Sequence, residues 1–565
     1  MPKDDKASEP LGFSSGGSNP YGSEQKSDDT LGSREHSART QTQSDAPEQQ
    51  RKDDSDGSGE GLRASSGDAF REKLKKMAEG GVTLGETQPG GEKKAPRKRM
   101  SEEERRARVK RKVSKALRRK EAEEKRRKGW GYGFVILTLF TFFGLVTVAT
   151  YFVVLNTNTS LPNILVNASI FALLFFIIIL FFRYFVLIIF SFLHHATTRH
   201  IDEITPEYKP LKASLLVPAF NEGIVIENSI KSLLELTYPN YEIIVINDGS
   251  KDDTLKIARK WEGWHDNVQV RVLDQPNMGK ANALNHGASV ATGEVVICID
   301  GDSRLSHNTL GAGMRHFADP KIGAVAGNVK VVNRSNMVTR LQTLEYIQGL
   351  NLVRRAQAFI HAVNIIPGPI GLFRRKALID VGGWDDDTFA EDCDLTLKML
   401  NSGYKIDYEP DAISMTEAPE DLIPLLKQRY RWTRGILQSM RKHASGLVNT
   451  KAGWRVMLTM WQMVLEGIVW PLMNIGATMM FVIVAVLYGM SPLLVLWWVQ
   501  LTVLDTIASL HAIAMERESL ALVPIAIIYR IAFIQIVDVT KMVASIEELL
   551  GVRMGWGKLE RKGRI

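Results

Sequence analysis

The sequence predicts an α/β domain with a mainly parallel sheet, inserted between transmembrane helices and preceded by a disordered N-terminal tail. Two observations predict the domain and its setting. Between residues 209 and 446, short runs of Val, Ile and Leu alternate with segments of helical spacing, as in sheets covered by helices on both faces. Uncharged or weakly charged apolar stretches flank this block, and several are long enough to cross a bilayer.

Four runs in the block read as buried strands, and two segments between them read as helices. The strands are "ASLLVPAFNE", "YEIIVINDGSKDDT", "VQVRVLDQ" and "GEVVICIDGDSRL", and the helices are "IENSIKSLLELTY" and "GKANALNHGASVA". In open sheets of this kind, ligands bind beyond the carboxyl ends of the strands. Polar side chains gather at those ends here, which predicts a binding site at that edge.

The first 128 residues contain no predicted domain. Residues 1–96 are polar, lack apolar periodicity and are predicted to be disordered. Residues 97–128 hold 17 Lys or Arg against 6 Asp or Glu, so the net charge of +8 is a local feature. A nucleic-acid site is one interpretation, but a basic flank beside a membrane span is favoured, and we expect no nucleic-acid partner. The two cysteines indicate no disulfide framework.

Apolar segments on both sides of the block predict a membrane protein. Residues 129–194 are expected to form a hairpin of two spans, with Arg183 snorkelling or near the inner end. Residues 454–545 are expected to hold an interfacial helix and a bundle of spans, followed by a basic tail at 546–565. The segments are Trp130–Leu155, Ile164–Leu193, Trp454–Trp470 (interfacial), Pro471–Tyr488, Pro492–Ile513 and Leu520–Val543. A total of four, five or six spans fits the pattern.

The last apolar stretch carries an unusual number of polar side chains for a span. These are Arg530, Gln535, Asp538 and Lys541. Groups of this kind are costly against lipid, so we expect them to pack inside a bundle or to line a path.

"VVICIDGDS" delivers Asp300 and Asp302 at a strand end, with Gly301 between them. Extended backbone would point the two side chains to opposite faces, so a turn at Gly301 is needed for them to converge. Carboxylates are the ligands that Mg²⁺ and Mn²⁺ prefer, often together with a substrate phosphate. The alternative is an acidic turn with no metal.

Two further strand ends offer weaker signals. Asp248 in "NDGSKDDT" could accept a hydrogen bond from a nucleobase or a ribose, or could cap the helix after it. Lys280 in "NMGKANALN" follows a flexible glycine and could meet a phosphate, or could be a solvated lysine at a helix start.

"FAEDCDLTLKML" opens a helix with Glu391, Asp392 and Asp394. A helix N-terminus favours negative charge, so we expect it to lower the pKa values of these carboxyl groups. One of them could act as a base that removes a proton from a hydroxyl. The alternative is an ordinary acidic helix start.

"LKQRYRWTRG" sets Gln428, Arg431 and Trp432 shortly before the second apolar region. An arginine and a tryptophan beside a membrane usually form an interfacial anchor. The order of all the motifs, however, changes this interpretation. "VPAFNE", "INDGS", "GKANALN", "CIDGDS", "FAEDCDLT" and "KQRYRW" together resemble the processive family-2 glycosyltransferases, the membrane-embedded synthases of cellulose, chitin, hyaluronan and poly-N-acetylglucosamine. The resemblance covers about residues 209–446 and the flanking membrane segments.

The resemblance implies a nucleotide-sugar-binding fold of the GT-A type and a role for each matching residue. Pro218, Asn221 and Glu222 would line the uridine, Asp248 would hold the base and Lys280 the diphosphate. Asp300 and Asp302 would hold a Mg²⁺- or Mn²⁺-bound diphosphate. Asp392, with Glu391 beside it, would be the general base. Gln428, Arg431 and Trp432 would lie at the channel mouth, with Arg431 on the diphosphate and Trp432 against an acceptor sugar. Ala390 stands where the family usually has threonine.

The implied reaction is an inverting, processive transfer from a UDP-sugar, with UDP-N-acetylglucosamine favoured, to a growing β-linked polysaccharide. The segment from Ala390 to Gly435 is most similar to the bacterial poly-β-1,6-N-acetylglucosamine synthases. A chitin, hyaluronan or β-glucan synthase, or a non-processive lipid glycosyltransferase, is the alternative. The implied partners are the UDP-sugar, the polysaccharide and membrane lipids, with a small accessory membrane subunit as a further candidate. The expected location is a bacterial inner membrane, with the catalytic domain in the cytoplasm.

Overall fold

The computed structural model describes residues 146, 164–204, 210–449 and 453–552. The predicted tail at 1–96 and the basic segment at 97–128 lie outside the described residues. So does the first predicted span, Trp130–Leu155, apart from residue 146, and the predicted basic tail is described only as far as residue 552.

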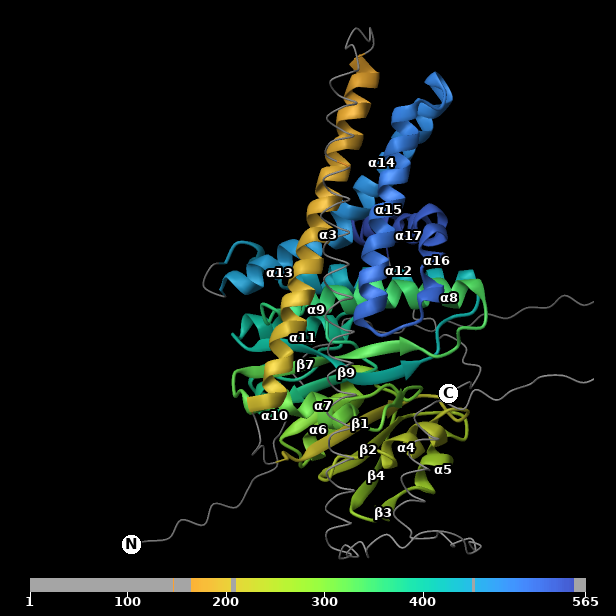
Figure 1. Ribbon diagram of the computed structural model, residues 1–565. Helices are drawn as coiled ribbons and strands as arrows, with labels where there is room; N and C mark the ends of the chain where they lie inside the picture. The colour runs from red at the N-terminus through yellow and green to blue at the C-terminus, as the bar shows by residue number, and fades with distance from the viewer. Residues whose placement is uncertain (1–145, 147–163, 205–209, 450–452, 553–565) are drawn as a thin grey trace, which may run out of the picture. The chain divides into compact units, whose positions relative to one another are not determined.

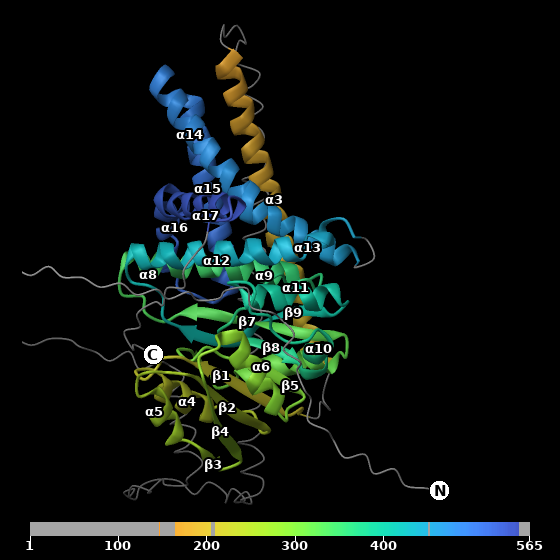
Figure 2. The ribbon, with the colours of Figure 1, turned by 180° about the vertical axis from the view of Figure 1, so that it is seen from behind.

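A nine-stranded sheet organises residues 213–416, in the order β3-β4-β2-β1-β5-β8-β7-β9-β6 (Figures 1 and 2). The strands are β1 (Ala213–Ala219), β2 (Tyr241–Asp248), β3 (Gly263–His265), β4 (Val268–Gln275), β5 (Val295–Cys298), β6 (Arg304–Leu305), β7 (Ile322–Val331), β8 (Gly371–Arg374) and β9 (Lys405–Thr416). All four predicted strands are present, as β1, β2, β4 and β5.

The strands β4, β2, β1 and β5 form the parallel part of the sheet that the sequence predicts, and β3 pairs antiparallel to β4 at the edge. β1 pairs in parallel with both β2 and β5, and β2 pairs in parallel with β4. Every residue of β2 and of β5 is buried, as expected for strands covered on both faces. Parallel neighbours bring the ends of β1, β2 and β5 to the same edge, where the polar motifs follow.

The second half of the sheet is mixed. β8 runs antiparallel to both β5 and β7, β7 pairs in parallel with β9, and β6 pairs antiparallel to β9. The fold class is confirmed as a GT-A-like α/β domain, and its sheet as a whole is mixed. β6 has only 2 residues, too few to show a pattern, and β8 has only two apolar residues between Gly371 and Arg374.

Alternate residues of the central strands face two separate cores. Leu215 and Val217 pack in the core that includes Ile230 of α4, whereas Leu216 packs with Leu284 of α6 on the other face. The helices of the domain are α4 (Ile226–Leu234), α5 (Thr254–Arg259), α6 (Lys280–Val290), α7 (Thr309–Met314), α8 (Met337–Glu345), α9 (Leu352–Ala358), α10 (Arg375–Asp380), α11 (Glu391–Asn401) and α12 (Leu422–Lys442).

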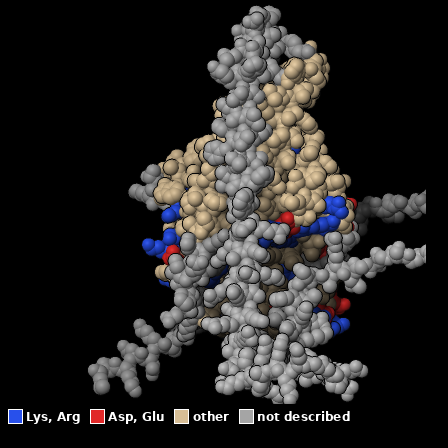
Figure 3. Space-filling view, viewed as in Figure 1, with Lys and Arg blue, Asp and Glu red and all other residues tan. Residues whose placement is uncertain are grey.

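Four helical runs among the described residues are long and apolar enough to cross a membrane. They are Phe171–Thr198, Trp454–Leu487, Leu494–Met515 and Leu520–Leu549. The helices that contain them are α3 (Ile164–Ile204), α13 (Trp454–Val464), α14 (Trp470–Tyr488), α15 (Pro492–Met515), α16 (Ile525–Ile528) and α17 (Ile534–Leu549). On the face drawn in Figure 3, the surface over these helices is nearly uncharged, whereas the charged side chains gather over the domain.

Two of the four polar side chains of the last apolar stretch are buried inside the bundle, as predicted, and Gln535 and Lys541 are half-buried. Arg530 is buried, with Nε 3.1 Å from Asp505 Oδ2 of α15 and Nη2 donating to Asn474 Oδ1 of α14 at 2.9 Å. Asp538 is also buried and accepts from Asn474 Nδ2 at 2.7 Å. These contacts join α14, α15 and α17 through charges that would be costly against lipid.

Arg183 of α3 forms a two-pronged ion pair with Glu466, at 2.7 and 2.8 Å. Its charge is therefore balanced by a carboxylate within the described helices. Glu466 belongs to the π-helical turn between α13 and α14, in the segment predicted to lie at the interface. α13 itself exposes Trp454, Leu458 and Trp461 on one face, the spacing of an amphipathic helix.

A buried ionic network holds β9 against the short 3-10 helix Arg315–Ala318, which follows α7 and precedes β7. His316 is 5% exposed and lies with Nδ1 3.1 Å from Asp407 and Nε2 2.8 Å from Glu409. Arg315 also pairs with Glu409, at 2.6 Å. Although burial disfavours the charged form, the two carboxylates raise the pKa of His316 to about 9. His316 is therefore an imidazolium that balances two buried carboxylates.

Replacing His316 with alanine should destabilise the domain in a pH-dependent way. The loss should be about 3–5 kcal/mol, as for other buried ion pairs that lose one partner. Because the folded pKa of about 9 exceeds the ordinary value of 6.5, the imidazolium stabilises the fold fully below pH 6.5, and this contribution disappears as pH rises through 9. In nanodiscs, the melting temperature of His316→Ala should therefore be lower than that of the wild type, and this difference should become smaller above pH 9. Exposed His307 gives the control variant His307→Ala. A gap that does not change with pH would contradict the assignment.

Candidate active site

The ends of β1 and β2 are tied together by their own turn residues. Asn221 has a φ of +54° and accepts from the backbone N–H of Lys251 at 2.7 Å. The Asn221 N–H donates to Ser250 Oγ at 2.9 Å, and the Glu222 N–H donates to Thr254 Oγ1 at 2.8 Å. The turns after β1 and β2, which carry residues predicted to bind the uridine, are therefore hydrogen-bonded to each other.

The turn after β5 packs directly against the end of β1. A Cβ added at Gly301 would lie 3.2 Å from the carbonyl oxygen of Pro218 and 3.4 Å from Cγ of Glu222. Only a small residue fits there without displacing one of them. Pro218 and Glu222 thus lie beside the turn that carries Asp300 and Asp302.

Asp248, at the end of β2, holds the loop that leads into α6. Its carboxylate accepts from the N–H groups of Met278 and Gly279, each at 2.9 Å, and from Nε2 of Gln275 at 2.8 Å. This network fixes the backbone immediately before Lys280. Contact between Asp248 and a nucleobase stays a prediction, and positioning of the Lys280 loop is a role that the sequence did not indicate.

Lys280 connects Asp300, a predicted ligand of the donor diphosphate, to Glu391, the neighbour of the predicted base Asp392. Its Nζ lies 2.7 Å from Asp300 Oδ1 and 3.0 Å from Glu391 Oε1. Asp392 lies in the same pocket, so the structure brings together Lys280, Asp300, Glu391 and Asp392. The pocket is lined by Lys280, Leu284, Cys298, Ile366, Pro367, Gly368, Phe373, Trp384, Glu391 and Asp392.

Gly368 is a site residue that the sequence reasoning missed. A Cβ at this position would lie 2.7 Å from Lys280 Nζ and 3.5 Å from both carboxylate oxygens of Asp300. Any side chain would therefore displace the central ion pair. The cue in the sequence is the run "IPGPIG", in which two glycines flank a turn.

Asp392 has a raised pKa, contrary to the expectation from its position at the start of α11. Burial, and then the neighbouring charge of Glu391, raise the pKa of Asp392 to about 6, although Lys280 and the N–H of Cys393 act in the opposite direction. The cost of removing the carboxylate from water outweighs the effect of the helix N-terminus. A carboxyl group with this pKa can take up a proton near neutral pH.

Gln428, Arg431 and Trp432 all lie on α12, but they have different surroundings. Gln428 is buried and its Oε1 accepts from Nη1 of Arg429 at 2.6 Å. Arg431 and Trp432 are half-buried. The Trp432 ring lies with its centroid 4.3 Å from the Arg429 guanidinium and packs beside Tyr346 at 6.4 Å between ring centroids.

Arg429 and Arg354 are two arginines that the sequence reasoning did not single out. Arg429 forms an ion pair with Glu345 at 2.6 Å. This pair fixes the guanidinium group against which the ring of Trp432 packs. Arg354 of α9 is 7% exposed, and its Nε donates to the carbonyl oxygen of Ile365 at 3.3 Å, directly before the pocket wall at Ile366. The doublet "RR" at 354–355, inside an otherwise apolar segment, was the available signal.

The predicted metal ligands occupy two environments. The Asp300 side chain is 28% exposed and faces Lys280, whereas Asp302 is buried with 4% of its surface exposed. Among the residues that the structure describes, one group of at least three His, Cys, Asp or Glu side chains is close enough to hold a single ion, and it consists of Asp385, Asp387 and Asp394. Shared metal binding by Asp300 and Asp302 therefore stays a prediction.

Residues 214–382 match the family model "Glycosyl transferase family 2". This region is a family-2 glycosyltransferase domain. The matched residues include Lys280 of the pocket and Asp300 beside it, so the predicted family-2 glycosyltransferase domain is confirmed, and processivity stays a prediction. Asp392 and the whole of α12 lie beyond the match.

Curated relatives of the glycosyltransferase domain agree on one activity. The poly-beta-1,6-N-acetyl-D-glucosamine synthase of Staphylococcus aureus strain COL is 39% identical over 223 residues, which are 39% of this chain and 54% of the relative. The synthase of the same name from Staphylococcus epidermidis is 37% identical over 239 residues, 42% of this chain and 58% of the relative. The chain thus spans between half and three-fifths of the length of these relatives.

One solved structure similar to the chain is a mannosyltransferase from Pyrobaculum calidifontis in complex with GDP-Man and Mn²⁺. It is 21% identical, with a TM-score of 0.47, and the match covers 67% of this chain and 99% of that chain.

Proposed function

We propose that this protein is an inverting, processive glycosyltransferase. It polymerises a UDP-sugar, with UDP-N-acetylglucosamine as the favoured donor, into a β-linked polysaccharide and moves the product across the membrane. One observation carries the proposal: Lys280, Glu391 and Asp392 line a single pocket at the edge where β1, β2 and β5 end, and Asp300 forms an ion pair with Lys280. The pocket combines a cation for a diphosphate with a buried carboxyl group suited to be a base.

Asp392 accepts the proton of the acceptor hydroxyl as the hydroxyl oxygen attacks the anomeric carbon of the donor. The bond between this carbon and the β-phosphate oxygen breaks, and UDP leaves with the electron pair. One displacement inverts the anomeric centre, so an α-linked donor yields a β-linked product. The pKa of about 6 lets Asp392 be ionised before the step and take the proton during it.

Lys280 and Arg431 stabilise the departing UDP. Lys280, now shared between Asp300 and Glu391, offers its ammonium to the diphosphate, and Arg431 from α12 offers a guanidinium suited to phosphate oxygens. Trp432, held by Arg429 and Tyr346, presents a ring against which an acceptor sugar stacks. Pro218, Asn221, Glu222 and Asp248 form the uridine side.

Oxygen ligands at Asp300 and Asp302 suit Mg²⁺ or Mn²⁺, and Asp300 is partly exposed beside Lys280, the cation proposed to meet the diphosphate. Such an ion would offset the negative charge of the diphosphate. The residues present therefore fit the ion.

The membrane role rests on the four apolar helical runs and on their contact with α12. Arg434 of α12 donates to Glu548 of α17 at 2.5 Å and to the carbonyl oxygen of Val552 at 2.6 Å. The helix that carries Arg431 and Trp432 is thus bonded to the last apolar helix. We propose a bacterial inner-membrane location with a cytoplasmic domain, an exposed face of α13 on lipid, and a small accessory membrane subunit as a candidate partner.

The activity should rise with pH through a midpoint near 6. Asp392 must be ionised to act as a base, and the structure without ligands corresponds to the state that kcat/KM reports. Protonation below pH 6 should therefore reduce kcat/KM about tenfold for each further pH unit. UDP release measured between pH 4.5 and 8 checks this, and a constant kcat/KM across the range would contradict it.

The donor test uses the purified chain in lipid nanodiscs with Mg²⁺ or Mn²⁺. UDP-N-acetylglucosamine, UDP-glucose and UDP-glucuronate are supplied singly and in pairs, and both UDP release and product size are followed. We expect a long polymer from UDP-N-acetylglucosamine alone, with β-1,6 linkages. A polymer from UDP-glucose alone, or one that needs two donors, would point to a glucan or hyaluronan synthase. Single transfers without a polymer would contradict processivity.

A further inference from the structure

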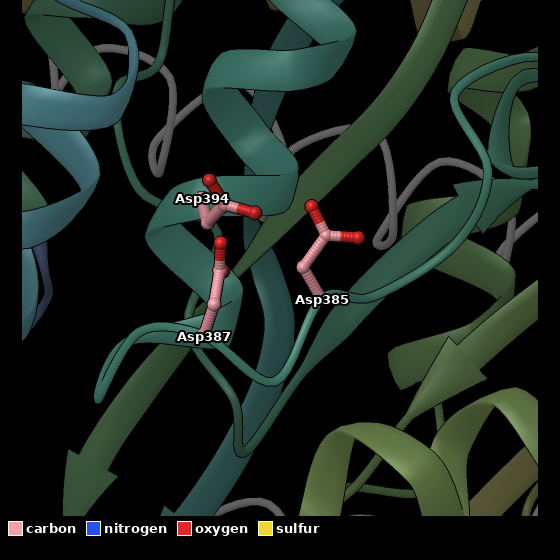
Figure 4. Close-up of side chains that lie close together, drawn as sticks. All are labelled: Asp385, Asp387 and Asp394. Atoms are coloured by element: carbon pink, nitrogen blue, oxygen red, sulfur yellow. The ribbon is translucent and has the colours of Figure 1, made fainter. Parts of the chain in front are cut away.

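Three carboxylates, those of Asp385, Asp387 and Asp394, lie close together at the start of α11 (Figure 4). Lys442, at the C-terminal end of α12, contacts all three. Its Nζ is 2.6 Å from Asp385 Oδ2, 2.8 Å from Asp387 Oδ1 and 3.1 Å from Asp394 Oδ2. Asp385 and Asp387 belong to the loop before α11, and Asp394 belongs to its first turn. One ammonium group therefore joins the end of α12 to both sides of the α11 N-terminus.

A histidine and a second lysine also contact these carboxylates. His443 Nε2 lies 2.8 Å from Asp394 Oδ1, and Lys398 Nζ lies 2.9 Å from Asp385 Oδ1. Asp394 has no exposed surface, so its carboxylate depends on these partners. The three carboxylates could hold a metal by their spacing alone, but protein cations already occupy the space between them. We therefore interpret the cluster as a joint between two helices.

A second contact between the same helices comes from an uncharged residue. A Cβ at Gly435 would lie 2.6 Å from the backbone nitrogen of Ala390 and 2.7 Å from its Cβ. Beside it, Gln438 Oε1 accepts from the N–H of Phe389 at 3.1 Å. The close approach of α12 to this backbone is thus independent of the charges at Lys442.

These contacts lie on the same side of α12 as the catalytic motif. Positions 428, 431, 435, 438 and 442 are spaced by three or four residues, which places them on one helix face. On the partner side, Asp392 lies between Ala390, which Gly435 contacts, and Asp394, which Lys442 contacts. Asp392, the proposed base, therefore lies between two residues that contact α12.

We propose that Lys442 and Gly435 are positioning residues that hold α12 in fixed register with α11, and so hold Arg431 and Trp432 at a set separation from Asp392. The inference rests on the proposed function. The leaving-group cation and the acceptor platform come from one helix and the base from another, so transfer requires a rigid joint between the two. Donor binding uses mainly β1, β2, β5 and Lys280, whereas Arg431 acts on the charge that builds on the departing diphosphate, so the joint affects transfer more than donor binding.

Lys442→Gln should separate donor consumption from transfer. We expect the donor KM to stay within about twofold of wild type and sugar incorporation to fall about 10- to 100-fold, the cost of a small misplacement. UDP release should fall less than sugar incorporation, because water can attack the donor when the sugar acceptor is poorly positioned. Lys442→Arg should restore most of the incorporation, since a guanidinium can bridge the same carboxylates. Lys376→Gln, which breaks one exposed pair with Asp380, is the matched control.

An unchanged ratio of UDP released to sugar incorporated in Lys442→Gln would overturn the proposal. So would equal loss of donor binding and transfer, or failure of Lys442→Arg to recover transfer. If Lys442→Gln does not fold, Asp387→Asn replaces it, because Asp387 is 57% exposed and supplies one of three contacts. If Asp387→Asn releases more UDP per sugar incorporated than Lys376→Gln does, the joint is supported. The same ratio as in the wild type would oppose it.

Hydrogen exchange separates failure of this inference from failure of the proposed function. In the protein without ligands, Lys442→Gln should increase exchange at Phe389–Asp394 and leave β1 and β2 unchanged. This readout needs no activity. If the wild-type protein makes no polymer, the proposed function fails, and the exchange data still decide whether the joint exists. Wild-type exchange at Phe389–Asp394 in the variant would overturn the joint.

Discussion

Asp392→Asn should abolish polymer synthesis and leave the binding of UDP-sugar almost intact. Asparagine keeps the shape of the side chain but cannot take up the proton of the acceptor hydroxyl. The loss of a positioned base should lower kcat about 10²- to 10⁴-fold. Donor affinity, measured by calorimetry in nanodiscs, should change by less than about threefold, because Lys280 and Asp300 remain in place.

The matched control for this variant is Asp411→Asn, at an exposed aspartate of β9 outside the pocket. It should keep wild-type synthesis and affinity. Normal synthesis by Asp392→Asn would exclude Asp392 as the base. Loss of both synthesis and donor affinity would assign Asp392 to donor binding instead.

Lys280→Met should lower kcat/KM about 10²- to 10³-fold, because it removes a preorganised cation from the leaving diphosphate. A second effect follows from the pocket itself. Lys280 lowers the pKa of Asp392, so its loss should move the acid limb of the kcat/KM profile above pH 6. Lys405→Met, which breaks one pair with Asp319 at 3.2 Å, is the control and should do neither.

The two effects of Lys280→Met are separable by experiment. A lower kcat/KM with an unshifted profile would show that Lys280 serves the donor and does not interact with Asp392. A shifted profile with normal kcat/KM at high pH would show the reverse. Wild-type values for both would remove Lys280 from the site.

Four strands and the helices α4, α6 and α11 could be predicted because their local pattern agrees with their buried positions. β1, β2, β4 and β5 are continuous or alternating apolar runs that end at turn residues. β9 could not be predicted in this way, because it carries Asp407 and Glu409 in buried positions. Their charges are balanced by His316, about 90 residues away, and no local pattern contains that information.

The candidate site shows the same division between local motif and distant partner. The sequence motifs identified Lys280, Asp300, Glu391 and Asp392, and the structure brings them together through the ion pairs of Lys280 and the pocket beside it. What the motifs could not indicate are the contacts that decide how these residues behave. The pKa of Asp392 rises because burial outweighs the helix N-terminus, and the extent of burial depends on the whole fold.

Some residues acquire a role only through contacts between elements distant in sequence. Gly368 makes room for the Lys280 ammonium, and Gly435 makes room for the backbone of Ala390. Lys442 appears in the sequence as one more basic residue at a helix end, although it contacts three carboxylates in the structure. Close approaches of this kind follow from tertiary packing and cannot be derived from spacing along the chain.

The central claim is that donor and base meet in the pocket between Lys280 and Asp392. A cryo-EM structure of Asp392→Asn in nanodiscs with UDP-N-acetylglucosamine and Mn²⁺ tests it most directly, because the substitution prevents turnover. We expect the diphosphate beside Lys280 and Asp300, the uridine against Pro218 and Asp248, and the anomeric carbon facing residue 392. A nucleotide bound elsewhere, or a sugar turned away from residue 392, would contradict the assignment of this pocket as the catalytic site.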